Sequence, residues 1–203
     1  LIDLSGHTAK NRLPIFARKP APIQVSWLGY FASTGLPAMD YILGDPYVTP
    51  FTEADHFVEK IWQLPESYLC FSPPEFDLDV GPLPASSNGF VTFGCLNQLS
   101  KMTAAVVSVR AKILHAVPDS KLLLKNNGIN IEPNRSRILS MFSEAGIPPW
   151  RLILEGKSTR EEHLACYQRI DIALSPFPYN GGTTSAEALW MGVPVITLRG
   201  DHF

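Results

Sequence analysis

The sequence has little of what would place it in several protein classes. It has no apolar run near the roughly 20 residues needed to span a bilayer, because Ile23–Gly29 and Val193–Leu198 have only the length of buried strands. Its net charge of −2 gives no basic field that would draw it to nucleic acid or acidic membranes. Its three cysteines, Cys70, Cys95 and Cys166, are far apart and odd in number. They argue against a disulfide framework and against a cysteine-based zinc site.

An initiator methionine and a charged leader are also missing, since the chain begins at Leu1 within an apolar strand pattern. We therefore expect no signal peptide, an internal piece of a longer protein, and a cytoplasmic location that extends to the nucleus in a eukaryote. What is present is a globular composition, with 45% apolar and 18% charged residues in a chain of 203. That length suits one sizeable domain or two small ones.

Residues 65–88 are distinguished by proline, which occurs five times between positions 65 and 84. This density opposes both a helix interior and a central strand, so we predict an extended connector between two lobes. Residues 1–64 then form part of an N-terminal lobe. Residues 89–203 form most of a C-terminal, nucleotide-binding lobe.

Strand and helix patterns alternate after the connector, which predicts an α/β lobe with a parallel, doubly wound sheet. Ligands of such sheets bind beyond the carboxyl ends of the strands, in the loops that open the following helices. The first lobe is less regular, with strands predicted at 22–29, 39–44 and 60–63. In the second lobe we predict strands at 90–94, 121–125, 151–155, 172–175 and 193–198, and helices at 103–116, 135–145, 160–169 and 183–191.

The first informative loop follows the strand that ends at Gly94. Asn97, Gln98 and Lys101 should project polar groups above the edge of the sheet. A lone lysine in such a loop is more often a solvated surface charge than a functional group, although loops carry function disproportionately. We expect Lys101 to face solvent.

The second loop opens the helix predicted at 160–169. Thr159 and Glu162 have the spacing of a capping box, which explains much of this segment without any function. His163 lies one turn into the helix. A lone histidine there is more often a satisfied surface residue than a ligand contact.

The third loop, 175–187, carries the strongest local signal. Gly181 and Gly182 expose backbone N–H groups, and Thr183 and Thr184 add hydroxyls at a helix N-terminus. Such a terminus binds anions, and a diphosphate suits it. Glu187, one turn further on, could hold ribose hydroxyls. The plain alternative is a glycine-rich turn with a threonine N-cap, since the P-loop and the Rossmann glycine pattern are both missing.

Metal binding has one candidate, Asp77 with Asp79, because an Asp-x-Asp pair can hold a metal with a nucleotide sugar. It lies in the proline-rich connector without a preceding strand, so we give it little weight. No other cluster of histidine, cysteine and carboxylates has metal spacing. A lysine and a helix terminus could balance a diphosphate, so we predict no metal and no cofactor.

Several stretches together resemble the catalytic region of the O-GlcNAc transferase and SPINDLY family, along nearly the whole chain. The run Arg18–Tyr30, with its Pro-Ala-Pro-Ile-Gln and Trp-Leu-Gly-Tyr segments, is the most specific. The others are Asp3–Thr8, Asn97–Lys101, Phe177–Thr184 and Glu187–Pro194.

The resemblance implies a GT-B fold of two Rossmann-like lobes and an inverting, metal-independent transfer of a sugar to serine or threonine of proteins. Full-length relatives carry tetratricopeptide repeats that recruit the protein acceptor. By motif match, Lys101 contacts the donor diphosphate with Gln98 beside it, and Thr183 and Thr184 hold the phosphates next to Gly182. His163 lies against the base, Arg160 near the nucleotide, and Glu187 at the ribose.

The donor is not settled by the motifs. Animal O-GlcNAc transferases have His, Lys and Asp where Gly182, Arg160 and Glu187 stand. His7 matches the bacterial and SPINDLY-like branch, whereas Gln98 favours the O-GlcNAc branch. We expect UDP-GlcNAc, with the GDP-fucose of plant SPINDLY proteins as the alternative. A non-catalytic nucleotide-binding remnant and a GT-B enzyme acting on small molecules or glycans are further alternatives.

Overall fold

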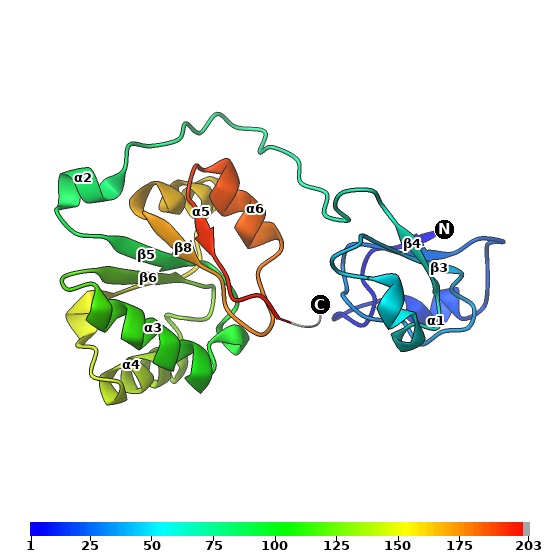
Figure 1. Ribbon diagram of the computed structural model, residues 1–203, viewed down its shortest axis with the longest axis horizontal. Coiled ribbons are helices and arrows are strands. Elements are labelled where there is room, and N and C mark those ends of the chain that lie inside the picture. Colours follow the sequence, from blue (N-terminus) through cyan, green and yellow to red (C-terminus); the bar gives the residue numbers. More distant parts are fainter. Residues whose placement is uncertain (201–203) are drawn as a thin grey trace. The chain divides into compact units, whose positions relative to one another are not determined.

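The computed structural model describes residues 1–200 and divides them into two compact units, residues 1–72 and 73–200 (Figure 1). The boundary lies inside the segment that we predicted as a connector. The last three residues of the predicted C-terminal lobe, 201–203, lie outside the described residues. No helix in the described part is both long and apolar enough to cross a membrane.

The first unit is built on a parallel sheet in the order β1-β2-β3-β4. Two short helical segments that sequence patterns did not predict, α1 and η1, lie between the strands. The strand expected over 22–29 contracts to two residues, because Leu28 has a positive φ of 66° that ends the extended backbone. The elements are β1 (Ile2–Asp3), α1 (Leu13–Phe16), β2 (Val25–Ser26), β3 (Tyr41–Gly44), η1 (Phe51–His56) and β4 (Lys60–Gln63).

The proline-rich segment is irregular from 65 to 83 but ends in a short helix, α2 (Pro84–Asn88), where we had predicted an extended chain. Proline is tolerated there because it stands at the start of the helix, where its missing N–H is not needed. Gly89 ends the helix in the left-handed conformation, with φ of 71°.

The second unit is the predicted doubly wound lobe, with five parallel strands in the order β7-β6-β5-β8-β9. Helices α3 and α4 cover one face of the sheet and α5 and α6 the other (Figure 1), each over its own apolar core. The elements are β5 (Thr92–Cys95), η2 (Leu99–Lys101), α3 (Ala104–Ala116), β6 (Lys121–Lys125), α4 (Asn134–Glu144), η3 (Pro149–Arg151), β7 (Leu152–Glu155), α5 (Arg160–Ala165), η4 (Cys166–Arg169), β8 (Ile172–Leu174), α6 (Thr183–Trp190) and β9 (Val195–Ile196).

Two predicted elements of this lobe are clearly shorter in the structure, while the ends of the others move by at most two residues. The helix expected over 160–169 changes from α-helix to 3₁₀-helix after Ala165. The strand expected over 193–198 forms only at Val195–Ile196, since its pairing partner β8 is itself three residues long.

Candidate functional site

The strand order of the second unit reverses at β5, which pairs with β6 on one side and β8 on the other. The chain leaves β5 toward one face of the sheet, through α3, and leaves β8 toward the other, through α6. Open α/β sheets bind their ligands at such a switch point, beyond the carboxyl ends of the strands. We therefore expect a ligand site at the loops that follow β5 and β8.

Lys101 connects these two loops. Its Nζ donates a hydrogen bond to the backbone carbonyl of Asn180 at 2.8 Å and lies 3.5 Å from Asn97 Oδ1. The ammonium also stands 4.1 Å from the ring centroid of Tyr179. Lys101 is half-buried, so our expectation that it faces solvent was wrong. The reason is the loop after β8, which folds over it.

Burial also lowers the pKa of Lys101, partly opposed by the nearby Cys95. An ammonium has three N–H donors, and one of them serves Asn180. Even with the long contact to Asn97, the group is a partly desolvated positive charge that is fixed in place and retains a donor for an anion.

The N-terminus of α6 lies beside this lysine. Gly182 occupies the N-cap and provides no side chain, so Thr183 is the first helical residue and not the cap. Among the hydrogen bonds of residues 1–200, none engages the backbone N–H groups of Gly182, Thr183 or Thr184. Unpaired donors at the positive end of a helix dipole form an anion site.

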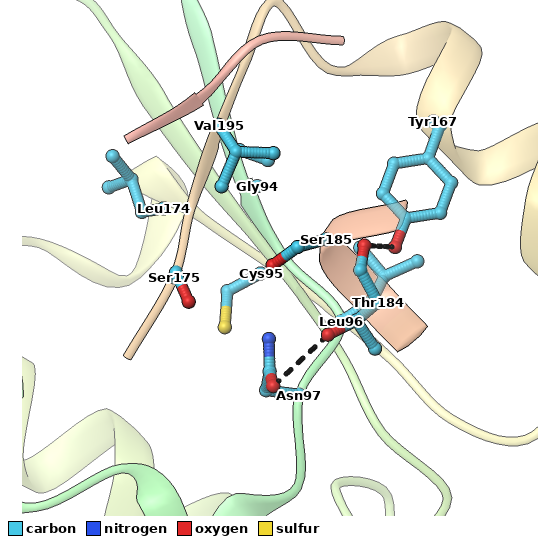
Figure 2. A pocket seen from close by; sticks show the side chains of 11 residues that line it. Gly94, Cys95, Leu96, Asn97, Tyr167, Leu174, Ser175, Thr184, Ser185 and Val195 are labelled. Atoms are coloured by element: carbon cyan, nitrogen blue, oxygen red, sulfur yellow. Dashed lines mark hydrogen bonds between the residues drawn. The ribbon is translucent and has the colours of Figure 1, made fainter. Parts of the chain in front are cut away.

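Side-chain contacts fix that terminus over the sheet. Asn97 Oδ1 accepts a hydrogen bond from Thr184 Oγ1 at 3.2 Å, and Ser175 Oγ accepts one from Gly181 N at 3.0 Å. Figure 2 shows Asn97, Ser175 and Thr184 around a small hollow. Its volume is about 10 Å³, the room of a single water molecule. The hollow itself is therefore too small to hold a nucleotide.

A second group of predicted residues meets on the neighbouring helices. Glu187, in the second turn of α6, is only 3% exposed. Its Oε1 lies 2.5 Å from Nη1 of Arg160, and its Oε2 lies 3.5 Å from Nε2 of His163. That separation is too long for a good hydrogen bond, and Oε2 has no hydrogen-bond partner within the described chain.

Burial alone would raise the pKa of Glu187, but His163 and Arg160 outweigh it and hold that pKa below its usual value. The carboxylate is therefore ionised and already engaged. The role of Glu187 at the ribose stays a prediction, and the sequence had not indicated its contacts with Arg160 and His163. The capping box of α5 is confirmed, because Thr159 Oγ1 accepts from Glu162 N while the Glu162 carboxylate accepts from Thr159 N. It fixes the turn that carries Arg160.

Tyr167 joins the two groups, and sequence reasoning missed it. Its hydroxyl donates to the backbone carbonyl of Thr184 at 2.9 Å (Figure 2), and its ring meets that of His163 edge to face at 6.3 Å. Burial raises its pKa, so it stays neutral. Nothing in the sequence distinguished Tyr167 from an ordinary buried aromatic residue.

The remaining candidates are more loosely placed. Gln98 is exposed and is the N-cap residue before η2, three positions before Lys101. Asp77 and Asp79 lie in the irregular stretch between 65 and 83. Within residues 1–200, no group of three or more histidine, cysteine or carboxylate side chains is arranged to hold a metal ion.

Comparison with known proteins shows which family the chain resembles. The model of glycosyl transferase family 41 matches residues 1–72 and 83–203. A protein of Oryza sativa subsp. japonica, named probable UDP-N-acetylglucosamine–peptide N-acetylglucosaminyltransferase SPINDLY, is 44% identical over 202 residues, which are 99% of this chain and 22% of the relative. The Arabidopsis thaliana protein of the same description named SEC is 34% identical over 207 residues, which are 98% of this chain and 21% of the relative.

A solved structure is also similar over the whole chain. It is a mutant of the Thermobaculum terrenum O-GlcNAc transferase, 42% identical with a TM-score of 0.90, and the match covers 100% of this chain and 38% of that one. This establishes the predicted α/β fold of the GT-B type. The chain spans about a fifth of the length of the curated relatives it matches.

Proposed function

Because the chain belongs to glycosyl transferase family 41, we propose that its second unit binds the donor of a protein glycosyltransferase, which transfers GlcNAc from UDP-GlcNAc to serine or threonine. One observation carries this proposal. Lys101 and the unpaired N–H groups at the start of α6 meet at the switch point of the sheet. That combination suits a diphosphate without a metal ion.

In the proposed reaction an acceptor hydroxyl attacks the anomeric carbon from the face opposite the diphosphate, which inverts that carbon. The bond from the sugar to the phosphate oxygen breaks, its electron pair stays on the nucleoside diphosphate, and the hydroxyl proton passes to a base. Negative charge grows on the leaving diphosphate. Donors that are already aimed at growing charge are typically the largest catalytic contribution.

The chain's own residues divide this work. Lys101 is fixed by Asn180 and, because it is already half-buried, has less solvation to lose when the donor binds than an exposed lysine has. Thr183 and Thr184 offer N–H groups and hydroxyls to the phosphates, with Gln98 beside them. His163 and Arg160 face the nucleoside from α5, held by Glu187.

UDP-GlcNAc is our choice of donor because the names of the similar proteins from rice and Arabidopsis both give UDP-N-acetylglucosamine and a peptide acceptor. Gln98 favours the same choice. The second candidate is a SPINDLY-like fucosyl transfer from GDP-fucose, which the greater similarity to the SPINDLY protein favours. In either case we propose that tetratricopeptide repeats outside this chain recruit the acceptor protein.

The test is a transfer assay on the full-length protein with a serine- and threonine-containing peptide library. UDP-GlcNAc and GDP-fucose are supplied separately, and the peptides are analysed by mass spectrometry. We expect a mass increase of one N-acetylhexosamine with the first donor. A mass increase of one deoxyhexose, seen only with GDP-fucose, would establish the fucosyl alternative. If neither modification occurs while UDP or GDP still binds, the non-catalytic alternative is correct.

A further inference from the structure

Arg110 is a buried cation without a buried counterion. It stands in the middle of α3 and is 2% exposed. Its Nη2 donates to the backbone carbonyl of Leu174 at 2.9 Å, and its Nη1 lies 3.2 Å from the sulfur of Met102. None of the ion pairs within residues 1–200 includes it.

The other buried charges of this unit are compensated. Lys125 and Glu187 have ion-pair partners. Arg151 donates four hydrogen bonds, among them to carbonyls at the C-terminal end of α3, where the helix dipole favours a cation. Asp171 accepts two backbone N–H groups. Arg110 has one carbonyl and one sulfur, which is poor compensation for a charge that costs several kcal/mol to bury.

The position of Arg110 suggests where its counterion lies. Leu174 is the last residue of β8 and lines the hollow at the switch point. Met102 directly follows Lys101 and is the C-cap of η2. The guanidinium thus contacts the end of β8 and the residue that follows Lys101, so it touches both segments that lead into the site.

We propose that Arg110 supplies a permanent positive charge beneath the donor's diphosphate, and that this diphosphate is the counterion which the ligand-free protein lacks. The inference rests on the proposed function of the site. Arg110 acts through space and need not touch the phosphates. In a poorly solvated interior a charge acts over several ångströms with little screening.

The experiment separates charge from structure by using two ligands that differ only in the diphosphate. Affinities of UDP and uridine, with GDP and guanosine in parallel, are measured by ligand-observed NMR competition on the full-length protein. The variants are Arg110→Met, Arg110→Gln and Arg110→Lys. Lys112→Met is the matched control, because Lys112 is on the same helix but exposed to solvent, where salt screens its charge.

We expect Arg110→Met and Arg110→Gln to weaken the nucleoside diphosphate by roughly tenfold or more while the nucleoside alone is unchanged. Arg110→Lys should stay within about threefold of the parent, and Lys112→Met should change nothing. An equal loss for both ligands would show a structural role and overturn the proposal. So would an Arg110→Lys protein as weak as Arg110→Met, since hydrogen-bond geometry would then matter more than charge.

Two outcomes remain. If Arg110→Met and Arg110→Gln do not fold, Arg110→Lys decides, because retained diphosphate affinity supports the charge and a tenfold selective loss overturns it. If the parent binds neither diphosphate, the proposed function itself has failed. Alternatively, the parent binds the diphosphate and every Arg110 variant keeps the same ratio of diphosphate affinity to nucleoside affinity. That result would refute only the role of Arg110.

Discussion

Lys101 Nζ donates a hydrogen bond to the backbone carbonyl of Asn180 at 2.8 Å, although the two residues are 79 positions apart. This bond joins the loop after β5 to the loop after β8 and places a cation beside the first turn of α6. Because Asn180 contributes its backbone, no side-chain pattern could have indicated it. The bond makes Lys101 both a structural and a catalytic candidate, so experiments must separate the two roles.

Lys101→Ala should lower the rate of transfer by about 100–1,000-fold, because it removes one donor aimed at the leaving diphosphate. The folded state should lose about 1 kcal/mol with the Asn180 hydrogen bond, more than for a free surface lysine. Initial rates and urea denaturation measure the two effects. Lys112→Ala, an exposed lysine on α3, is the control and should alter neither. Unchanged transfer by Lys101→Ala would remove the assigned role.

The pKa of Lys101 gives a second, independent test. Because burial lowers this pKa below its usual 10.5, the ammonium should lose its proton at a lower pH than an exposed lysine does. Affinity for UDP should therefore decline as pH rises toward 10.5 and begin to decline before it. Lys101→Arg should remove the decline, since a guanidinium stays protonated there. Calorimetric titrations between pH 7 and the alkaline limit of stability measure it, and identical profiles would contradict the assignment.

The ion pair of Glu187 should make the stability of the fold depend on pH. Stability should fall as pH decreases, whereas the UDP affinity that depends on Lys101 falls as pH increases. Its pKa in the folded protein lies below the usual 4.5, so its ionised form stabilises the fold above that pH. The stabilisation is lost as pH falls through the folded-state pKa. Glu187→Gln should therefore be less stable than the parent by about 1 kcal/mol or more at pH 7. The difference should shrink below pH 4.5.

Thermal denaturation from pH 7 to pH 3 gives that comparison. Arg160→Ala is the companion variant, because it removes the ion pair while leaving the carboxylate buried. We expect it to weaken nucleotide binding as well, while Glu187→Gln affects binding only through Arg160 and His163. A difference in stability that is constant across this pH range would show that the ionisation of Glu187 contributes nothing.

Periodicity and end signals predicted most of the second unit, because its elements are long and locally encoded. The helix predicted at 103–116 is α3, and Thr103 is its N-cap, whose Oγ1 accepts from Val106 N. Lys121–Lys125 is the predicted strand to the residue. Local patterns predicted strand length poorly where the neighbouring strand limits the pairing, as for the two-residue strand β9. The helix at Pro84 was missed because proline density alone was taken to exclude helix.

The sequence could indicate which residues belong to the candidate site, but not which contacts they make with one another. Sequence placed Lys101 and Thr184 in loops or first turns at one sheet edge, with Glu187 one turn further into its helix. It could not show that Glu187 is buried against Arg160, since burial depends on how α5 and α6 pack. Nor could it show Tyr167 bonded to the Thr184 carbonyl. Such contacts depend on distant segments, and no local pattern records them.

Donor choice should appear as a difference in affinity. Uracil and guanine differ in size and in their hydrogen-bonding edges, so a pocket made for one leaves polar groups unpaired with the other. Each such group costs about 1–3 kcal/mol, and about 1.4 kcal/mol is one decade of affinity. We expect UDP to bind at least about tenfold more tightly than GDP in competition on the full-length protein. Tighter binding of GDP would reverse our choice of donor and leave the role of Lys101 standing.

The central claim is that the switch point of the second unit binds a nucleoside diphosphate through Lys101 and the start of α6, without a metal ion. Its most direct test is calorimetric titration of UDP and GDP into the full-length protein, with and without a chelator, beside Lys101→Ala. The account predicts that at least one nucleotide binds, that the chelator leaves the affinity unchanged, and that Lys101→Ala weakens it. Binding that disappears with the chelator, or that Lys101→Ala leaves intact, would contradict it.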